Sequence, residues 1–192
     1  MIPSEKITGI VLSGGKSVRM GMDKALIEWN GKSFMKHVID AMTPLVREMI
    51  IVSDDPGHQI EGIPRIPDIM PSAGPLAGIC TGLEHSLSEF NLILSCDIPL
   101  IDTETLRLLL DPIDTKTDMV LLSDGKRSMP LIALYRKRCL QPALDLLHSG
   151  KRRMMDLTER LNCQTILVPK EDRFRIQNIN SPIDLNAINH AN

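Results

Sequence analysis

The chain has 192 residues, of which 43% are hydrophobic, 24% charged and 3% aromatic, and its formal net charge is −2. This length suits one domain with a full core, so residues 1–192 are predicted to form a single domain. The slight negative charge argues against an extended nucleic-acid surface, and the scarcity of aromatic residues argues against a stacking platform for single strands.

The composition also argues against a secreted or membrane protein. Residues 1–6 lack the apolar core of a signal peptide, and no apolar run approaches the roughly 20 residues that span a bilayer. The four cysteines form no Cys-x-x-Cys pair, and the five histidines are widely scattered. We therefore expect reduced thiols in a cytoplasmic protein, and we expect no zinc site.

The first predicted strand, residues 7–12, is an apolar β-branched run that leads into the segment 12–24. Gly14 and Gly15 follow the strand, and their lack of side chains lets backbone N–H groups approach an anion closely. Three cationic side chains come next: Lys16, Arg19 and Lys24. The spacing fits neither a Walker A loop nor G-x-G-x-x-G. A polyphosphate suits this loop; the alternative is a glycine-rich turn with solvated charges.

Strands and helices then alternate along the chain. The first half is predicted to begin with an extended piece at 25–29, an Asn30–Gly31 turn and a helix from Ser33 to before Pro44. Strands at 48–53 and 63–67 follow, and then a helix that opens at 74–78 and carries Leu87 on its apolar stripe. A strand at 91–96 and a helix at 103–110 complete this half. The second half is predicted to contain strands at 118–123 and 130–135, helices at 138–148 and 154–161, a strand at 165–168 and a helix capped by Ser181–Asp184. This alternation predicts an α/β fold with a doubly wound, mostly parallel sheet.

Polar residues follow several of these strands directly. In an open α/β sheet, ligands bind outside the carboxyl ends of the strands, so these residues are expected to gather on one edge. They are the segment 13–24, Ser53, Asp68 and Asp97.

Asp97 follows a nearly continuous apolar strand, and a carboxylate there has two interpretations. It would cap the helix that begins at Thr103, although Asp102 lies closer to that start. It would otherwise bind magnesium, which prefers one or two carboxylates together with substrate phosphates. We favour the metal ligand.

Two further groups of polar residues lie in the last quarter of the chain. Lys151, Arg152 and Arg153 form a basic run that is either a solvated turn or an anion site for a second substrate. Asn178 and Asn180 alternate, so on an extended segment both face one side, where neutral amides suit a polar heterocycle. The alternative is that these asparagines close a turn before the last helix.

The string L-S-G-G-K-S-x-R-M-G-x-D-K at 12–24 resembles the signature of nucleotidyltransferases that build sugar and cofactor nucleotides. Within that superfamily the chain is most similar to the molybdenum cofactor guanylyltransferases, from about Thr8 to about Leu185. The segments that carry this closer resemblance are G-P-L-A-G at 74–78, D-G-K-R at 124–127 leading into 130–135, G-K-R-R-M at 150–154 and I-Q-N-I-N-S-P at 176–182.

The resemblance implies a single-domain, three-layer, Rossmann-like nucleotidyltransferase fold. It implies transfer of GMP from GTP to the terminal phosphate of molybdenum-carrying molybdopterin, with Mg²⁺ as cofactor and pyrophosphate as the other product. It implies no nucleic acid and no membrane, and it leaves open contacts with other cofactor-biosynthesis proteins or molybdoenzymes. A cytidylyltransferase or other nucleotidyltransferase on a phosphorylated acceptor stays open, as does a nucleotide-binding regulator without catalysis.

Residue by residue, the sequence and the resemblance assign three sets of site residues. The catalytic set is Arg19, Lys24 and Asp97, with Asp97 also the metal ligand. The nucleotide-binding set is Leu12, Ser13, Gly14, Gly15, Lys24, Ser53, Asp68 and Asp97, with Asp68 near the base or the ribose. The acceptor-binding set is Arg152, Arg153, Asn178 and Asn180. Three positions depart from the family pattern: Ser13 replaces a common alanine, Ser53 a common asparagine and Met129 a common histidine.

Overall fold

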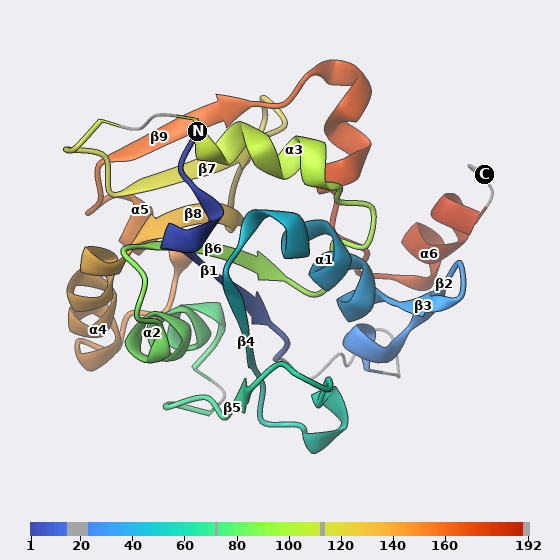
Figure 1. Ribbon diagram of the computed structural model, residues 1–192, viewed down its shortest axis with the longest axis horizontal. Coiled ribbons are helices and arrows are strands. Elements are labelled where there is room, and N and C mark those ends of the chain that lie inside the picture. Colours follow the sequence, from blue (N-terminus) through green and yellow to red (C-terminus); the bar gives the residue numbers. More distant parts are fainter. Residues whose placement is uncertain (15–22, 72, 112–113, 190–192) are drawn as a thin grey trace.

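The computed structural model describes residues 1–14, 23–71, 73–111 and 114–189. These residues form a seven-stranded sheet in the order β5-β4-β1-β6-β8-β7-β9 (Figure 1). The strands are β1 (Ile7–Leu12), β4 (Glu48–Val52), β5 (Arg65–Ile66), β6 (Phe90–Ser95), β7 (Met119–Ser123), β8 (Ser128–Arg136) and β9 (Cys163–Leu167). Strand β8 is antiparallel to both of its neighbours, and the other pairings of this sheet are parallel. The prediction of a mostly parallel sheet is confirmed.

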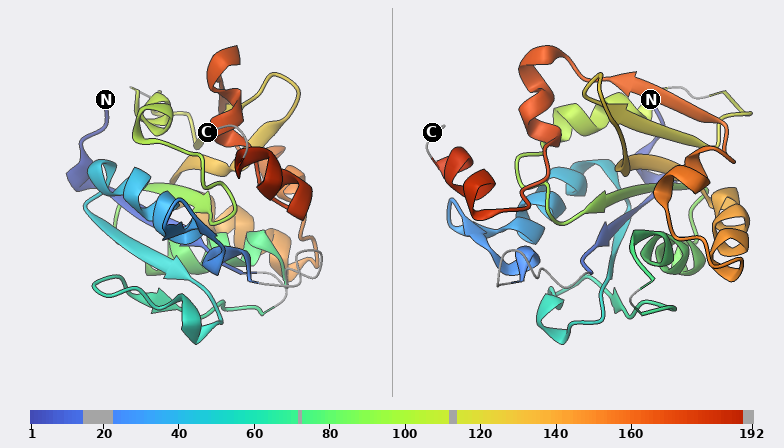
Figure 2. Two further views of the ribbon diagram at one scale, coloured as in Figure 1. Left: turned by 90° about the vertical axis from the view of Figure 1, so that its right-hand side faces the viewer. Right: turned by 180° about the vertical axis from the view of Figure 1, so that it is seen from behind.

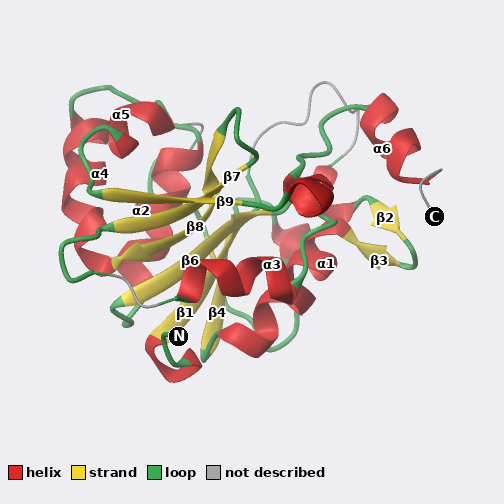
Figure 3. Cartoon of the chain, turned by 90° about the horizontal axis from the view of Figure 1, so that it is seen from above, coloured by secondary structure: helices red, strands yellow, loops and turns green. Residues whose placement is uncertain are grey.

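Helices cover both faces of the sheet, which gives three layers (Figure 3). The α-helices are α1 (Phe34–Met42), α2 (Pro75–His85), α3 (Thr103–Arg107), α4 (Leu140–His148), α5 (Met154–Thr158) and α6 (Pro182–Asn189). Helices α1 and α3 pack into one buried apolar cluster, and α2, α4 and α5 pack into another on the opposite face.

Strand β1 shows why its sequence is almost entirely apolar. All six of its residues are buried. Because side chains alternate along a strand, Ile7 and Val11 join the cluster of α1, whereas Ile10 and Leu12 join the cluster of α2. A strand with helices on both faces has no solvent side, so neither face tolerates a run of polar residues.

The segment after the glycine loop differs from the expectation of one extended piece at 25–29. Residues Lys24–Leu26 form a short 3₁₀ helix, η2, because the Asp23 carboxylate accepts a hydrogen bond from the backbone N–H of Ala25. Strands β2 (Glu28–Trp29) and β3 (Lys32–Ser33) then form a hairpin. Its Asn30–Gly31 turn is confirmed, with positive φ angles of 48° and 75°.

Helix α2 ends earlier than its apolar pattern predicts. Ser86 adopts an extended conformation, and the Lys137 ammonium donates hydrogen bonds to the carbonyl groups of Leu83, Glu84 and Ser86. Leu87 therefore lies beyond the helix and is 94% exposed, so its assignment to the apolar stripe is wrong.

The predicted capping box at the start of the last helix is confirmed. The backbone N–H of Asp184 donates to the Ser181 hydroxyl, and the Asp184 carboxylate accepts from that hydroxyl and from the backbone of Asn180. Helix α6 lies beside the β2–β3 hairpin (Figure 2). Ile188 of α6 and Ile179, which precedes the helix, share a buried cluster with Ile27 and Phe34, the residues that flank the hairpin. This packing positions the residues that precede α6, among them Ile179, whose backbone N–H donates to the carbonyl of Asp97.

The four cysteines are free thiols, as expected: Cys80, Cys96 and Cys139 are buried, and Cys163 is exposed. Burial raises the pKa of the Cys96 and Cys139 thiols to about 12. Within the described residues, no helix combines the length and the apolar character that crossing a membrane requires.

Candidate functional site

The carboxyl ends of β1, β4 and β6 meet at one edge of the sheet. The backbone N–H of Ser13 donates to the carbonyl of Val52 at 3.0 Å, and the N–H of Cys96 donates to the carbonyl of Leu12 at 3.0 Å. These bonds continue the sheet one residue past each strand, so the polar residues that follow start from fixed positions. The predicted gathering of Ser13, Ser53 and Asp97 on one edge is therefore confirmed for the backbone.

Asp97 is held by side chains on both sides of its carboxylate. Its Oδ1 accepts from the Ser95 hydroxyl at 2.5 Å and from the Asn178 amide at 2.8 Å. Its Oδ2 lies 3.6 Å from the Lys24 ammonium, and the two side chains are only 17% and 19% exposed. Asp97 does not cap α3, because Asp102 does so by accepting from the backbone N–H of Thr105. The alternative that Asp97 is a helix cap is wrong.

The asparagines of the C-terminal segment lie against this carboxylate. The backbone N–H of Ile179 donates to the carbonyl of Asp97 at 2.8 Å, which aligns the segment with the end of β6. Asn178 and Asn180 then face the same place, because Asn178 donates to Asp97 and the Lys24 ammonium donates to the Asn180 amide oxygen. We call Lys24, Asp97, Asn178 and Asn180 the Asp97 cluster.

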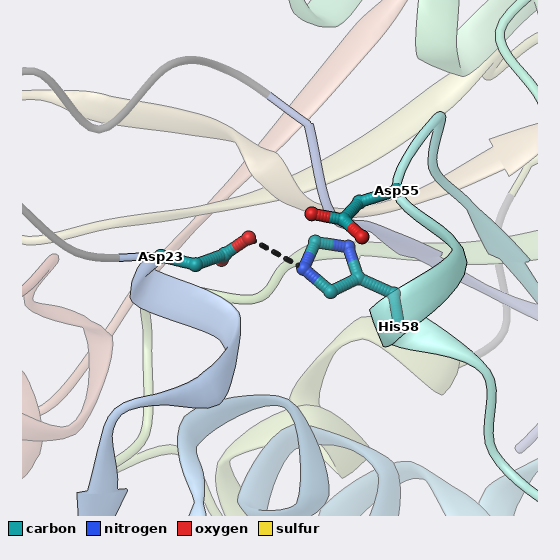
Figure 4. Close-up of side chains that lie close together, drawn as sticks. All are labelled: Asp23, Asp55 and His58. Carbon is teal, nitrogen blue, oxygen red and sulfur yellow. Dashed lines mark hydrogen bonds and ion pairs between the residues drawn. The ribbon is translucent and has the colours of Figure 1, made fainter.

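A second group of polar side chains is centred on His58, a residue that the sequence assignments do not include. This residue ends a short 3₁₀ helix, η4 (Pro56–His58), and is 3% exposed. Its Nδ1 lies 2.9 Å from the Ser13 hydroxyl and 2.6 Å from the Ser53 hydroxyl. Its Nε2 lies 2.8 Å from the Asp23 carboxylate (Figure 4). No local pattern indicates these contacts, because Asp23 lies 35 residues and Ser13 lies 45 residues from His58 along the chain.

Asp55 lies close to the same imidazole (Figure 4). Among the described residues, one ligand atom each from Asp23, Asp55 and His58 lies within 4.8 Å of the others. The scattered histidines predicted no zinc site, yet the fold brings His58 close to two carboxylates. The distance between His58 Nε2 and Asp23 identifies this contact as a hydrogen bond.

Asp68 follows β5, the outermost strand on the β4 side of the sheet. Its Oδ1 accepts from the Thr81 hydroxyl and from the backbone N–H of Met70, both at 3.1 Å. Burial raises the pKa of the Asp68 carboxyl above its ordinary value. A Cβ placed on Gly78 would lie 3.2 Å from the Leu12 side chain and 4.0 Å from Asp68 Oδ2, so the G-P-L-A-G helix approaches both predicted nucleotide-binding residues closely.

Gly14 borders open space. A Cβ placed there would meet no heavy atom of the described chain within 4 Å. Ser53, whose role was in question because of its departure from asparagine, contacts His58 and also accepts from the backbone N–H of Asp55. The predicted residues Gly15, Lys16 and Arg19 lie outside the described residues.

Arg152 and Arg153 lie on an exposed turn between α4 and α5. The turn begins at Gly150, whose φ of 78° favours glycine, and the backbone N–H of Lys151 donates to the carbonyl of Leu146. The assigned acceptor-binding residues thus fall into two groups: the asparagines belong to the Asp97 cluster, and the arginines belong to this turn.

Comparison with known proteins identifies the family. Residues 9–165 match the family model described as the MobA-like NTP transferase domain. A relative from Flavobacterium johnsoniae named "Probable molybdenum cofactor guanylyltransferase" is 35% identical, with 96% of this chain and 97% of the relative covered. A relative of the same name from Bacillus cereus is 34% identical, with 84% of each chain covered.

A solved structure shows the same fold. Molybdopterin-guanine dinucleotide biosynthesis protein A from Archaeoglobus fulgidus superposes with a TM-score of 0.81 at 24% identity, with 96% of this chain and 97% of that chain covered. The family match over most of the chain, the identity to the curated relatives and the shared fold agree. This chain belongs to the MobA-like NTP transferase family and is a nucleotidyltransferase.

Proposed function

We propose that the protein transfers GMP from GTP to the terminal phosphate of molybdopterin carrying molybdenum. An acceptor phosphate oxygen attacks the α-phosphorus of GTP, a new P–O bond forms, and the bond to pyrophosphate breaks. The observation that carries this proposal is the Asp97 cluster, in which an ammonium group, a carboxylate and two amides converge at the carboxyl end of β6. The names of the relatives support the choice of GTP and molybdopterin.

The oxygen atoms of the cluster suit a divalent cation. Asp97 Oδ2 and Asn180 Oδ1 both face one positive charge, the Lys24 ammonium, so the site already directs oxygen ligands at a cation. Magnesium prefers such oxygen ligands, completed by substrate phosphates and water. Asp97 would hold Mg²⁺, which supplies neutralisation of the charge that develops on the phosphates.

The chain's own residues then position the substrates. We assign Lys24 and Arg19 to the phosphates of GTP, where charge-assisted hydrogen bonds are strongest. Asn178 keeps the Asp97 carboxylate oriented, and the transfer needs no nucleophilic side chain because the acceptor phosphate attacks directly. Positioning and charge neutralisation supply the catalysis.

We assign the guanine nucleotide to the opposite side of the same edge. The proposed binding residues are Leu12, Ser13, Gly14, Gly15, Ser53 and Asp68. The open space at Gly14 and the close approach of Gly78 to Leu12 and Asp68 support this placement. Guanine offers N1–H and N2–H₂ donors, which suit a carboxylate or carbonyl acceptor, whereas adenine offers an acceptor at N1.

We assign the acceptor to Arg152 and Arg153, with Asn178 and Asn180 between the acceptor and the cation. The arginines are exposed, and their guanidinium groups suit a phosphate bidentately. We further propose that residues 1–192 form one nucleotidyltransferase domain, since both helix layers share a single sheet. We also propose that the protein is cytoplasmic.

The test is pyrophosphate release with molybdopterin, magnesium and each nucleoside triphosphate in turn, together with competition binding of GTP, CTP and ATP. We expect GTP to be preferred, by up to about 10⁴-fold, because a site built for hydrogen bonding leaves polar groups unpaired with the wrong base. Preference for CTP would make the protein a cytidylyltransferase. Binding without pyrophosphate release would support the non-catalytic regulator.

A further inference from the structure

We propose that His58 is a positioning residue that sets the place of Lys24 through Asp23. The inference rests on the proposed function, in which Lys24 binds the phosphates of GTP. Neither the sequence motifs nor the proposed chemistry uses His58, yet it is a buried ring with defined hydrogen-bond partners at the edge where the nucleotide is expected.

The first step is the hydrogen bond between His58 and Asp23. An ionised carboxylate can only accept, so the proton of this 2.8 Å contact is assigned to His58 Nε2. Nδ1 lies within hydrogen-bond distance of the Ser13 and Ser53 hydroxyls, and both serines are buried. The ring is therefore anchored to the ends of β1 and β4, which are themselves fixed by the sheet.

The second step leads from Asp23 to Lys24. While Oδ2 of Asp23 accepts from His58, its Oδ1 accepts from the backbone N–H of Ala25 at 2.9 Å. That second bond caps η2, the 3₁₀ helix in which Lys24 is the first residue. One carboxylate thus joins the imidazole to the backbone that carries the Lys24 side chain, and this side chain reaches Asp97 and Asn180.

The turn that carries His58 fits closely against this helix. Asp55 Oδ1 accepts from the backbone N–H of Gly57 at 2.8 Å and thereby shapes the turn. A Cβ placed on Gly57 would lie 3.1 Å from Asp55 Oδ1 and 3.9 Å from the Leu26 side chain of η2. The turn that carries the imidazole therefore packs against η2, which suits a positioning role.

A metal ion at Asp23, Asp55 and His58 is the competing explanation. Zinc binds nitrogen and carboxylate oxygen at 2.0–2.2 Å, which at a tetrahedral angle separates the two ligand atoms by about 3.4 Å. The observed separation of 2.8 Å between Nε2 and Oδ2 is that of a hydrogen bond. The geometry therefore favours a direct contact without a metal.

The test is a double-mutant cycle between His58 and Lys24. We expect His58→Ala to lower kcat by about 30-fold at saturating GTP, because small misplacements of a catalytic group cost up to 10²-fold. In a Lys24→Ala background the same change should cost less than about threefold, since residues that act in series are not additive. Equal losses in both backgrounds would show a merely structural role and overturn the inference.

Asp23→Asn changes the contact between His58 and residue 23 but keeps the cap that residue 23 provides for η2. The asparagine oxygen still accepts from Ala25, but the charged acceptor for His58 Nε2 is lost. The ring can then keep a weaker bond to the asparagine amide only by moving its proton to Nδ1, which lies 3.2 Å from the Ser13 carbonyl. We expect this variant to lower kcat in the same direction as His58→Ala, but by no more than that variant does. The matched control is Leu109→Ala, a fully buried residue of η5 (Leu108–Leu110), which should lower Tm without changing kcat. Restoration of His58→Ala activity by Zn²⁺, or loss of wild-type activity on chelation of Zn²⁺ alone, would instead support the metal.

Wild-type pyrophosphate release keeps the two proposals apart. If the wild type is active and the cycle is additive, only the role of His58 fails. If the wild type releases no pyrophosphate with any nucleotide, the proposed function fails. The affinity of the wild type, both single variants and the double variant for Mg-GTP, measured by calorimetry, then replaces kcat in the double-mutant cycle. Coupling between His58 and Lys24 in that affinity supports the inference, and its absence overturns it.

Discussion

The Asp97 cluster and the basic turn at Lys151–Arg153 differ in how far their charged groups are buried. In the cluster, Lys24 and Asp97 are less than one-fifth exposed and are bonded to side chains from distant parts of the chain. The three residues of the turn are exposed to solvent. Preorganised groups act on a developing transition state, whereas exposed cations mainly attract and retain an anion. We therefore expect changes in the cluster to lower kcat and changes in the turn to weaken binding.

Asp97→Asn gives the largest expected effect. Asp97 is the proposed Mg²⁺ ligand, and removal of such a ligand costs several kcal/mol of transition-state stabilisation, so we expect kcat to fall by about 10³-fold while the fold is retained. Magnesium-dependent pyrophosphate release and the Tm of the variant measure the two parts of this prediction.

Asp102→Asn is the matched control for this change. Asp102 caps α3 and pairs with Arg175. Asparagine keeps the cap and loses only the partly exposed ion pair, so the free energy of unfolding should fall by less than about 1 kcal/mol, and kcat should stay within about threefold. Near-normal turnover of Asp97→Asn would contradict the assignment of the cluster to the chemistry.

Replacement of both Arg152 and Arg153 by alanine tests the other side of the comparison. Charge-assisted hydrogen bonds to phosphate are worth roughly 1.5–3 kcal/mol each, so we expect the KM for molybdopterin to rise by about tenfold or more. The KM for GTP and kcat should change much less. Titrations of each substrate at saturating levels of the other separate these quantities.

Arg138→Ala serves as the charge control, because it removes one cation outside the basic turn. Arg138 belongs to η6 (Lys137–Cys139), which directly precedes α4, and it pairs with Asp118. This variant should leave both KM values unchanged. If the double arginine variant instead weakened GTP and spared molybdopterin, the two substrate sites would have been exchanged.

Asp68→Asn is expected to give the smallest change in stability and a measurable change in affinity. Burial raises the pKa of Asp68, so its ionised form destabilises the fold, and this cost is lost as pH falls through the folded pKa. The variant should therefore be slightly more stable than the wild type at pH 7, by less than about 1 kcal/mol, because the carboxyl is partly solvated. This advantage should disappear toward pH 4. Thermal unfolding at both pH values checks the sign.

The same variant should bind GTP about tenfold more weakly, if Asp68 accepts a hydrogen bond from the base or the ribose. A stabilised protein with undiminished GTP affinity would remove Asp68 from the nucleotide site. That result would leave the raised pKa as a property of the fold alone.

Local patterns were sufficient to predict most elements of this fold. The apolar runs at 7–12 and 91–96, the Asn30–Gly31 turn and the capping box at Ser181 each involve contacts within a few residues. Placement of Asp97 on the ligand edge followed from a general property of parallel strands. The errors also had local causes, since Leu87 continues a helical period that Ser86 interrupts.

The partners of the site residues, in contrast, depended on the order of strands in the sheet. Asn178 meets Asp97 across 81 residues of sequence, and His58 meets Asp23 across 35. No periodicity or spacing encodes such contacts, because they arise only when β4, β1 and β6 become neighbours and α6 docks against the β2–β3 hairpin. The sequence by itself thus determined which residues carry charge at the strand ends. Tertiary packing decided which of those residues touch, and so which of them can act together.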